Sequence, residues 1–274
     1  MTMKASVIIS TYNSPAWLEK VLWGYQCQTT PDFEIVMADD GSGAETKALI
    51  ERFQAESPFD IRHVRHKDDG FRKWEIVNKA IEAAQGDYLI FTDGDCIPHR
   101  DLVAIHLARA TPGRYLSGAY CRLPMAASRA IGREDIMTGR AFSLRWLAAH
   151  GYGPTVKWLK IAVAGTPFEG VFNRITPAKK TFNGNNSSCF RDDALRVNGF
   201  DTRIRYGGGD REFGYRLEHA GITPLLIRYS APCLHLDHAR GYKSTEVRDR
   251  NLQLIAESRA ARRTRTEFGI VTHS

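Results

Sequence analysis

The sequence predicts an α/β fold in which a mainly parallel sheet is flanked by helices. Short apolar, β-branched runs begin at residues 6, 34, 61 and 87, so successive starts are 28, 27 and 26 residues apart, the length of one β-α-β step. The stretches between these runs carry apolar residues at helical spacing. With 274 residues, 43% of them hydrophobic and 25% charged, the chain has the composition and length of a globular domain with a sizeable core.

Two helices are predicted between the runs. Pro15 opens "PAWLEKVLWGYQCQ" at a first helical turn, and this segment places Trp17, Val21 and Leu22 on one side. The segment "RKWEIVNKAIEAAQG" has a single apolar face and is expected to end at Gly86, acting as its C-cap; the residues of that face are Trp74, Val77, Ile81 and Ala84.

After residue 122 the pattern loosens, and residues 123–160 predict an insertion of irregular helices and loops. Regularity returns with "DDALRVNGFD", a helix "DREFGYRLEHAG" that ends at Gly221, and a strand "ITPLLIRYS". The tail, residues 244–269, is expected to be a helix with a basic end. We therefore expect one domain with an elaborated second half.

Composition limits the partners and the setting. A net charge of +7 and a pI of about 9.2 favour polyanionic neighbours, such as phosphates, nucleic acid or an anionic membrane, without choosing among them. The five cysteines are odd in number and include no C-x-x-C pair, so neither a zinc site nor a disulfide framework is indicated and a reducing cytoplasm is the expected setting. Since no apolar run approaches the roughly 20 residues that span a bilayer, any membrane association is expected to be peripheral.

Polar side chains follow all four predicted strands. The strand ends read "STYN", "DDGS", "HKDDGFRK" and "TDGD". Each alone is equally explained as a helix N-cap or a turn, but ligands of open α/β sheets bind at the carboxyl ends of the strands. The glycine-rich cradles for dinucleotides and triphosphates are absent from the sequence. A divalent cation held by Asp93 and Asp95 would neutralise bound phosphates instead.

These motifs, in this order, resemble one known family. "SVIISTYN", "VMADDGS", "TDGDC" and "GGGDREFGYRL" are similar to motifs of the inverting family-2 glycosyltransferases with the GT-A fold, across roughly residues 4–240. The later part is most similar to bacterial polysaccharide and lipopolysaccharide glycosyltransferases and chondroitin-polymerase-type domains. The resemblance implies a single Rossmann-like GT-A domain over residues 1–274, with a nucleotide-binding half (1–121), an irregular acceptor-binding half (122–240) and a basic C-terminal helix (241–274).

The resemblance also implies roles for the residues of the nucleotide-binding half. Ser10 and Tyr12 match positions that line a uracil pocket. Asp40 matches the aspartate that accepts a hydrogen bond from the base, with Asp39 as its alternative. Arg72 matches a basic residue at the nucleotide site. Lys79 stands near a position where many members carry arginine, which leaves its role open.

The same resemblance implies a metal site. Asp93-Gly94-Asp95 matches the D-x-D motif, in which Asp93 contacts the ribose side and Asp95 ligates Mn²⁺ or Mg²⁺ on the diphosphate. His235 matches a histidine that ligates the metal in some related enzymes, and an imidazole ligand favours manganese. A structural role is the alternative for this histidine. His238 and Arg240 are alternatives for contact with the phosphates.

An inverting transfer needs a general base, and Asp210 matches that position. Its alternative role is an N-cap, with Glu212 and Arg216 forming a surface pair. Many relatives have Glu-Asp where this chain has Gly209-Asp210, so Glu212 is a candidate for sharing the acceptor-binding role. Asn185 either lines the sugar pocket or forms a turn.

Two further features keep more than one interpretation. Four aromatic side chains of the irregular segment either stack on sugars of an acceptor or belong to the core: Trp146, Tyr152, Trp158 and Phe168. The basic stretch "RAARRTR" is a solvated helix end, a surface for an anionic membrane, or a nucleic-acid contact. No aromatic platform accompanies the basic residues, so nucleic acid is not the expected partner.

The expected function is metal-dependent, inverting transfer of a sugar from a nucleotide donor, with UDP as the expected nucleotide. The expected acceptor is an oligosaccharide or a lipid-linked saccharide in bacterial surface polysaccharide or lipopolysaccharide synthesis, on the inner face of the cytoplasmic membrane. The alternatives are a sugar nucleotidyltransferase and a non-catalytic nucleotide- or carbohydrate-binding module.

Overall fold

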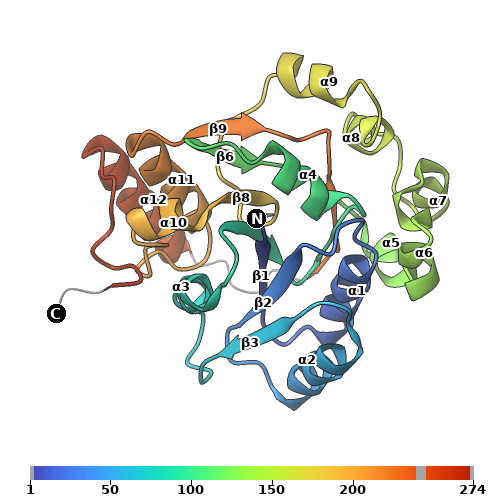
Figure 1. Ribbon diagram of the computed structural model, residues 1–274, viewed down its shortest axis with the longest axis horizontal. Coiled ribbons are helices and arrows are strands. Elements are labelled where there is room, and N and C mark those ends of the chain that lie inside the picture. The colour runs from blue at the N-terminus through green and yellow to red at the C-terminus, as the bar shows by residue number, and fades with distance from the viewer. Residues whose placement is uncertain (1–2, 239–244, 272–274) are drawn as a thin grey trace.

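A seven-stranded sheet forms the centre of the molecule (Figure 1). The computed structural model describes residues 3–238 and 245–271. The strand order is β3-β2-β1-β4-β8-β6-β9. The strands are β1 (Ala5–Thr11), β2 (Phe33–Asp39), β3 (Ile61–Arg65), β4 (Tyr88–Asp93), β6 (Arg114–Ser117), β8 (Ser187–Phe190) and β9 (Thr223–Leu226). The α/β prediction with four βα steps is confirmed.

The first four strands run parallel, and the sheet becomes mixed beyond them. Strand β1 pairs in parallel with β2 and β4, and β2 with β3. Strand β8 is antiparallel to both β4 and β6, while β9 lies parallel to β6 at the edge. Pro224 is tolerated in β9 because an edge strand leaves one row of backbone groups unpaired.

Each face of the sheet carries its own core, because successive side chains of a strand point to opposite faces. Val7 and Ile9 face a core built with α1 (Pro15–Gln26), α2 (Ala44–Glu56) and α4 (Leu102–Arg109). Ile8 faces the other core, built with α3 (Lys73–Ala83), α10 (Arg191–Arg196) and α11 (Gly209–His219). The sheet therefore holds the N-termini of α3 and α11 on the same side.

Two helix ends differ in how well they were predicted. Helix α11 ends before Gly221, whose φ of +88° is a left-handed conformation that favours glycine, as expected. Helix α3 ends at Ala83 with Ala84 as its cap, so the prediction of Gly86 as C-cap is wrong. A Cβ on Gly86 would lie 2.6 Å from the Lys4 carbonyl oxygen, so this glycine serves the close approach to β1.

A smaller sheet joins distant parts of the chain. Strand β10 (Cys233–His235) pairs antiparallel with β5 (Cys96–Ile97) and parallel with β7 (Tyr120–Arg122). His235 is in register with Cys96, and the Leu236 amide donates to the Asp95 carbonyl oxygen at 2.8 Å. This pairing fixes His235 beside Asp95.

The irregular segment is a string of short helices on the far side of the molecule from α12 (Thr245–Ala260) (Figure 1). These helices are α5 (Met125–Ala130), α6 (Arg133–Met137), the 3-10 helix η1 (Arg140–Phe142), α7 (Leu144–Ala149), α8 (Trp158–Val163) and α9 (Glu169–Ile175). The aromatic side chains of this segment differ in burial and in the rings that they contact. Tyr152 is buried and stacks with Trp158, Trp146 stacks on His150, and Phe168 is exposed.

The C-terminal segment does not continue as a helix with a free basic end. Helix α12 stops at Ala260, and the chain folds back against the α10 region. Asn198 donates to the carbonyl oxygens of Thr266 and Val271, and the Arg203 guanidinium lies 3.9 Å from the centre of the Phe268 ring. The expected long basic helix is therefore shorter than predicted, and its last residues are packed.

Candidate active site

A cavity of about 620 Å³ lies at the carboxyl ends of β1 and β4. Three of the four polar strand ends contribute side chains to it, and the "HKDDGFRK" segment contributes Gly70, Phe71 and Lys73. Its charged and imidazole lining residues are Asp40, Lys73, Asp93, Asp95, His235 and His238. The prediction that these strand ends meet at one edge is in accord with this arrangement.

Asp93 and Lys73 form an ion pair inside the cavity. The Lys73 Nζ lies 2.5 Å from Asp93 Oδ1, and the Ser10 hydroxyl donates to the same oxygen at 2.7 Å. Burial lowers the pKa of Lys73, but the carboxylates of Asp93, Asp210 and Asp95 outweigh it and hold that pKa above its ordinary value. Lys73 is therefore a cation at the centre of the acidic side chains.

Asp95, His235 and His238 bring three metal-ligating groups together. Their ligand atoms all lie within 4.8 Å of one another. The Asp95 Oδ2 oxygen lies 3.2 Å from His238 Nε2 and 3.8 Å from His235 Nε2. Burial raises the pKa of Asp95, but the two imidazoles hold it below its ordinary value, so the group is a carboxylate.

The hydrogen bonding of His235 suits it for a metal. Its Nδ1 lies 2.8 Å from the Leu236 carbonyl oxygen. Because a carbonyl oxygen can only accept a hydrogen bond, Nδ1 carries the proton and donates it to this bond. The lone pair then remains on Nε2, the atom that faces Asp95, as in histidine ligands held by an outer hydrogen bond. Cys96 also adjoins Asp93 and Asp95, but burial raises its pKa well above the usual range and keeps the thiol protonated. One carboxylate and two imidazoles fit a divalent cation such as Mn²⁺.

Asp39 and Asp40 face different surroundings because neighbouring residues of an extended chain point in opposite directions. Asp40 lines the cavity, where His66 Nε2 lies 2.7 Å from Oδ1 and the Arg72 amide donates to Oδ2. Asp39 is fully buried, accepts from the Ser42 amide at 2.7 Å and lies 2.9 Å from His63 Nε2. Asp40, and not Asp39, is available to a ligand in the cavity.

The loops after β1 and β2 hold each other in place. The Asn13 amide donates to the Ser42 hydroxyl, and the Asn13 side chain accepts from the Gly43 amide. Gly41 has a φ of +95°, and a Cβ there would lie 2.6 Å from the Asp68 Cα. The sequence "DDGS" is thus suited to a tight loop that presents Asp40 to the cavity.

Tyr12 and Arg72 differ in their relation to the cavity. Tyr12 lines it, and its hydroxyl donates to Asp68 Oδ2 at 2.9 Å. The Arg72 guanidinium instead lies 3.4 Å from Asp69 and 3.6 Å from Glu75, and it is not among the lining residues. Arg72 contributes its backbone amide, and the next residue, Lys73, contributes the cation.

Asp210 lies next to the cavity, in the first turn of α11. Its carboxylate accepts from the amides of Gly184 and Arg211, at 3.1 and 2.8 Å. A Cβ built on Gly184 would contact both Asp210 and Trp74, and Trp74 lines the cavity. Because Asp210 also acts on the charge of Lys73, its carboxylate shares the environment of Asp93 and Asp95.

Glu212 and Arg216 are buried, so the alternative in which they form a surface pair is wrong. Arg216 Nε donates to Glu212 Oε1 at 2.8 Å, its other nitrogens donate to the Val197 and Gly199 carbonyls, and the Ser258 hydroxyl donates to Glu212. These contacts leave Glu212 no access to an acceptor.

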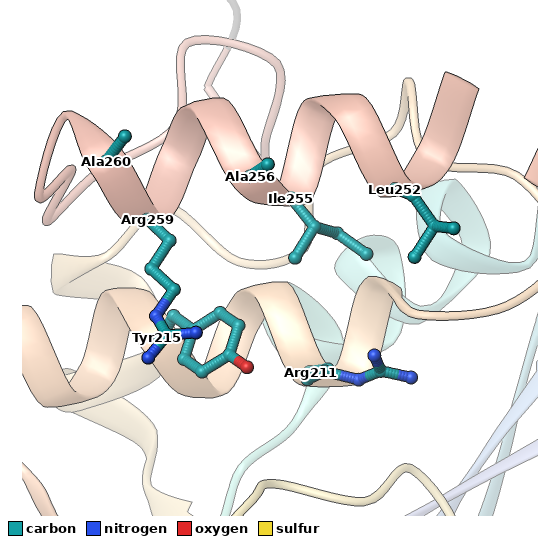
Figure 2. A pocket seen from close by; sticks show the side chains of 7 residues that line it. All are labelled: Arg211, Tyr215, Leu252, Ile255, Ala256, Arg259 and Ala260. Atoms are coloured by element: carbon teal, nitrogen blue, oxygen red, sulfur yellow. The ribbon is translucent and has the colours of Figure 1, made fainter. Parts of the chain in front are cut away.

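A second, shallow groove lies between α11 and α12. It is lined by Arg211, Tyr215, Leu252, Ile255, Ala256, Arg259 and Ala260 (Figure 2).

Known proteins with similar sequences are glycosyltransferases and polysaccharide synthases. The sequence profile "Glycosyl transferase family 2" matches residues 6–122. The chain is 28% identical over 273 residues to the uncharacterized glycosyltransferase YfnE of Bacillus subtilis. This match covers 89% of this chain and 67% of YfnE. It is 26% identical over 239 residues to the chondroitin synthase of Escherichia coli, covering 79% of this chain. These matches support a family-2 glycosyltransferase.

Solved structures show the fold of the chain. A mannosyltransferase from Pyrobaculum calidifontis, in complex with GDP-Man and Mn²⁺, superposes with a TM-score of 0.64 at 19% identity, covering 95% of this chain and 65% of that one. Staphylococcus aureus TarS 1–349 in complex with UDP-GlcNAc gives 0.62 at 16% identity, covering 95% and 69%. The fold is the GT-A fold, as predicted. The chain spans only 32% of the length of the chondroitin synthase.

The structure places some of the predicted site residues in the cavity and others outside it. The predicted residues that line it are Ser10, Tyr12, Asp40, Asp93, Asp95 and His235, and His238 joins them. The side chains of Asp39, Arg72, Asn185 and Asp210 are not among the lining residues, and Asp210 lies next to the cavity. Lys73 was missed, although two carboxylates at one strand end signalled the need for a nearby cation. Arg240 lies outside the described residues.

Proposed function

We propose that this chain transfers a sugar from a nucleotide-sugar, with UDP as the nucleotide, to a hydroxyl of a carbohydrate acceptor, with inversion at the anomeric carbon. The observation that carries the proposal is the grouping of Asp95, His235 and His238 beside the Lys73-Asp93 pair, with Asp210 close by. A cation-binding side and a free carboxylate near one cavity are what a metal-dependent transfer requires.

The donor would lie along the edge of the sheet. Tyr12 offers a ring to a nucleobase, and Asp40 offers an acceptor to a base N–H. Asp93, oriented by Ser10 and Lys73, would meet the ribose side. Asp95 with His235 and His238 would hold Mn²⁺ or Mg²⁺, which when bound supplies positive charge to the diphosphate as it leaves.

Asp210 is proposed as the general base. Two backbone amides orient its carboxylate, which would take the proton of the acceptor hydroxyl while that oxygen forms a bond to the anomeric carbon. The bond to the diphosphate oxygen breaks on the opposite side, so the configuration inverts. The nucleotide diphosphate leaves with the electron pair of that bond.

The halves of the domain would divide these tasks. Residues 1–121 supply most donor contacts, and residues 122–240 supply Asp210 and the acceptor side. The chondroitin and hyaluronan synthases among the relatives support an acceptor in polysaccharide synthesis, and lipopolysaccharide is a related setting. None of the described helices combines the length and the apolar character that a membrane span needs.

A donor screen tests the proposal. Purified protein would be incubated with UDP-, GDP- and dTDP-sugars, with Mn²⁺, with Mg²⁺ or with chelator, and the released nucleotide and the product anomer would be analysed. The proposal expects release from a UDP-sugar that stops with chelator. Formation of UTP and sugar 1-phosphate when pyrophosphate is added to the UDP-sugar would indicate a nucleotidyltransferase, and tight binding without turnover would indicate a binding module; either outcome would contradict the proposal.

A further inference from the structure

Exposed apolar side chains are concentrated in the segment of the chain that contains α8 and α9. Among the described residues, eleven large hydrophobic side chains are exposed, and five of these fall within residues 156–175. We call these five the α8–α9 surface: Val156, Leu159, Phe168, Val171 and Ile175. Such a concentration marks an interaction site, whereas singly scattered apolar residues do not.

Contacts on the opposite side of α9 hold this surface outward. Glu169 pairs with Arg109, and the Asn173 side chain donates to the Ser230 hydroxyl and accepts from the Tyr229 amide, each at 2.9 Å. The anchoring residues 169, 172 and 173 share one face, with Phe172 packing near the ring of Tyr229. Residues 168, 171 and 175 share the other face and are 65%, 52% and 67% exposed.

The segment of the chain that carries the α8–α9 surface is basic. Residues 151–180 contain five Lys or Arg residues, namely Lys157, Lys160, Arg174, Lys179 and Lys180. The single acidic residue of this stretch, Glu169, is engaged by Arg109. An apolar patch surrounded by cations has the composition of a surface that enters the headgroup region of a bilayer.

We propose that the α8–α9 surface docks this chain onto an anionic lipid membrane. Aliphatic and aromatic side chains would enter the boundary between headgroups and acyl chains, while the surrounding lysines and arginines meet the anionic headgroups. Charge decides against a second copy of the chain, because two such faces would bring like charges together. The proposal deepens the proposed function by bringing the enzyme to a lipid-linked acceptor, but lipid binding itself requires neither donor nor metal.

Vesicle flotation of the whole chain tests the proposal. Vesicles of equimolar phosphatidylglycerol and phosphatidylcholine would be compared with vesicles of phosphatidylcholine alone, without nucleotide or metal. We expect binding to the anionic vesicles, weakened at least about tenfold by the double variant Val171→Ser, Ile175→Ser, since each loses an apolar side chain from the interface. Lys179→Gln with Lys180→Gln should also weaken binding and reduce its dependence on salt.

Matched controls lie on the other side of the molecule. Leu252→Ser removes an exposed apolar side chain from α12, and Arg262→Gln with Arg263→Gln removes two cations from the basic stretch after it. Both should float as the unaltered chain does. Unchanged flotation of the double variant, or loss of flotation in the arginine variant, would overturn the proposal.

Two further measurements distinguish membrane docking from misfolding and from dimerisation. Equal circular dichroism melts and equal donor hydrolysis without acceptor would show that the double variant is folded, so that its lost flotation supports docking. Sedimentation of a dimer that the double variant abolishes, with no flotation of either protein, would instead assign the surface to a second copy. Flotation without any sugar transfer would leave docking intact and contradict only the proposed function.

Discussion

The Lys73 ammonium lies 2.5 Å from the Asp93 carboxylate, and the negative charges of Asp210 and Asp95 also act on it. This contact relieves the repulsion between Asp93 and Asp95, which flank the turn that ends β4 and bring carboxylate oxygens within 4.8 Å of each other. It also holds Asp93 at one geometry together with the Ser10 hydroxyl. Lys73 is therefore a positioning residue for the donor side of the site.

Removing this ammonium is expected to weaken transfer. Lys73→Met leaves Asp93 without its cation, and a hydrogen bond to a charged group is worth about 1.5–3 kcal/mol, so kcat/KM should fall roughly tenfold to hundredfold. Lys79→Met, which removes an exposed lysine paired with Glu75 on the same helix, is the control. Steady-state kinetics with a UDP-sugar would measure both, and equal rates would show that Lys73 has no part in the site.

Asp210→Asn is expected to abolish transfer while leaving donor binding in place. The amide cannot take a proton at neutral pH, and general bases contribute roughly 10²- to 10⁴-fold to the rate. Asp192→Asn changes a carboxylate in the first turn of another helix, α10, and should have no such effect. Product analysis and calorimetric titration with UDP would separate the two steps. Normal transfer by Asp210→Asn would require another base.

Gly209 is expected to be sensitive to a single methyl group. A Cβ at Gly209 would lie 2.4 Å from Trp74 Nε1, so Gly209→Ala should cost about 1–3 kcal/mol in the free energy of unfolding and displace the turn that carries Asp210. Gly170→Ala, in α9, meets nothing within 4 Å and should stabilise by about 0.5–1 kcal/mol. Urea unfolding of both variants would measure the difference, and equal stabilities would contradict this packing.

Stability is expected to fall in mild acid because of His106. This buried histidine lies 2.7 Å from the Ser188 hydroxyl and 2.9 Å from Asn186 Oδ1, and burial lowers its pKa from 6.5 to about 4. The folded state keeps it neutral while the unfolded state takes up a proton below 6.5. The contribution is therefore intact above pH 6.5 and is lost as the pH falls toward about 4, by up to about 3 kcal/mol.

Replacing the histidine isolates this effect. His106→Gln should flatten the dependence of the unfolding free energy on pH between 6.5 and 4, whatever its own stability, while His219→Gln at the surface should leave the slope unchanged. Denaturant unfolding across this pH range is the measurement. An unaltered slope in His106→Gln would mean that other groups account for acid sensitivity.

The strands and the cavity edge were predictable because their signals are local. Apolar runs at regular intervals located β1 to β4, and the D-x-D spacing placed Asp93 and Asp95 together. Local sequence does not distinguish Arg72 from Lys73, since the direction of each side chain is set by where α3 begins. The same limit applies to Asp39 and Asp40, whose opposite orientations follow from the end of β2.

Burial in the second half depended on contacts between distant segments. Glu212 and Arg216 have the spacing of a surface pair, but α12 and the loop after α10 cover them, with Ser258 donating to Glu212. The basic stretch after Ala260 gave no local sign that Thr266 would be held by Asn198. The placement of His235 by β5 and β10 likewise came only from the structure; sequence resemblance alone had indicated its role.

The central claim is that Asp95, His235 and His238 hold a divalent cation, and binding of Mn²⁺ in the presence of UDP tests it most directly. Electron paramagnetic resonance would compare the unaltered chain with His235→Ala and His219→Ala. The account predicts one bound Mn²⁺ per chain, an affinity lowered at least about tenfold in His235→Ala, and no change in His219→Ala. The rate of UDP-sugar turnover should fall when less Mn²⁺ is bound. Equal Mn²⁺ affinity in all three proteins, or full turnover with chelator, would contradict it.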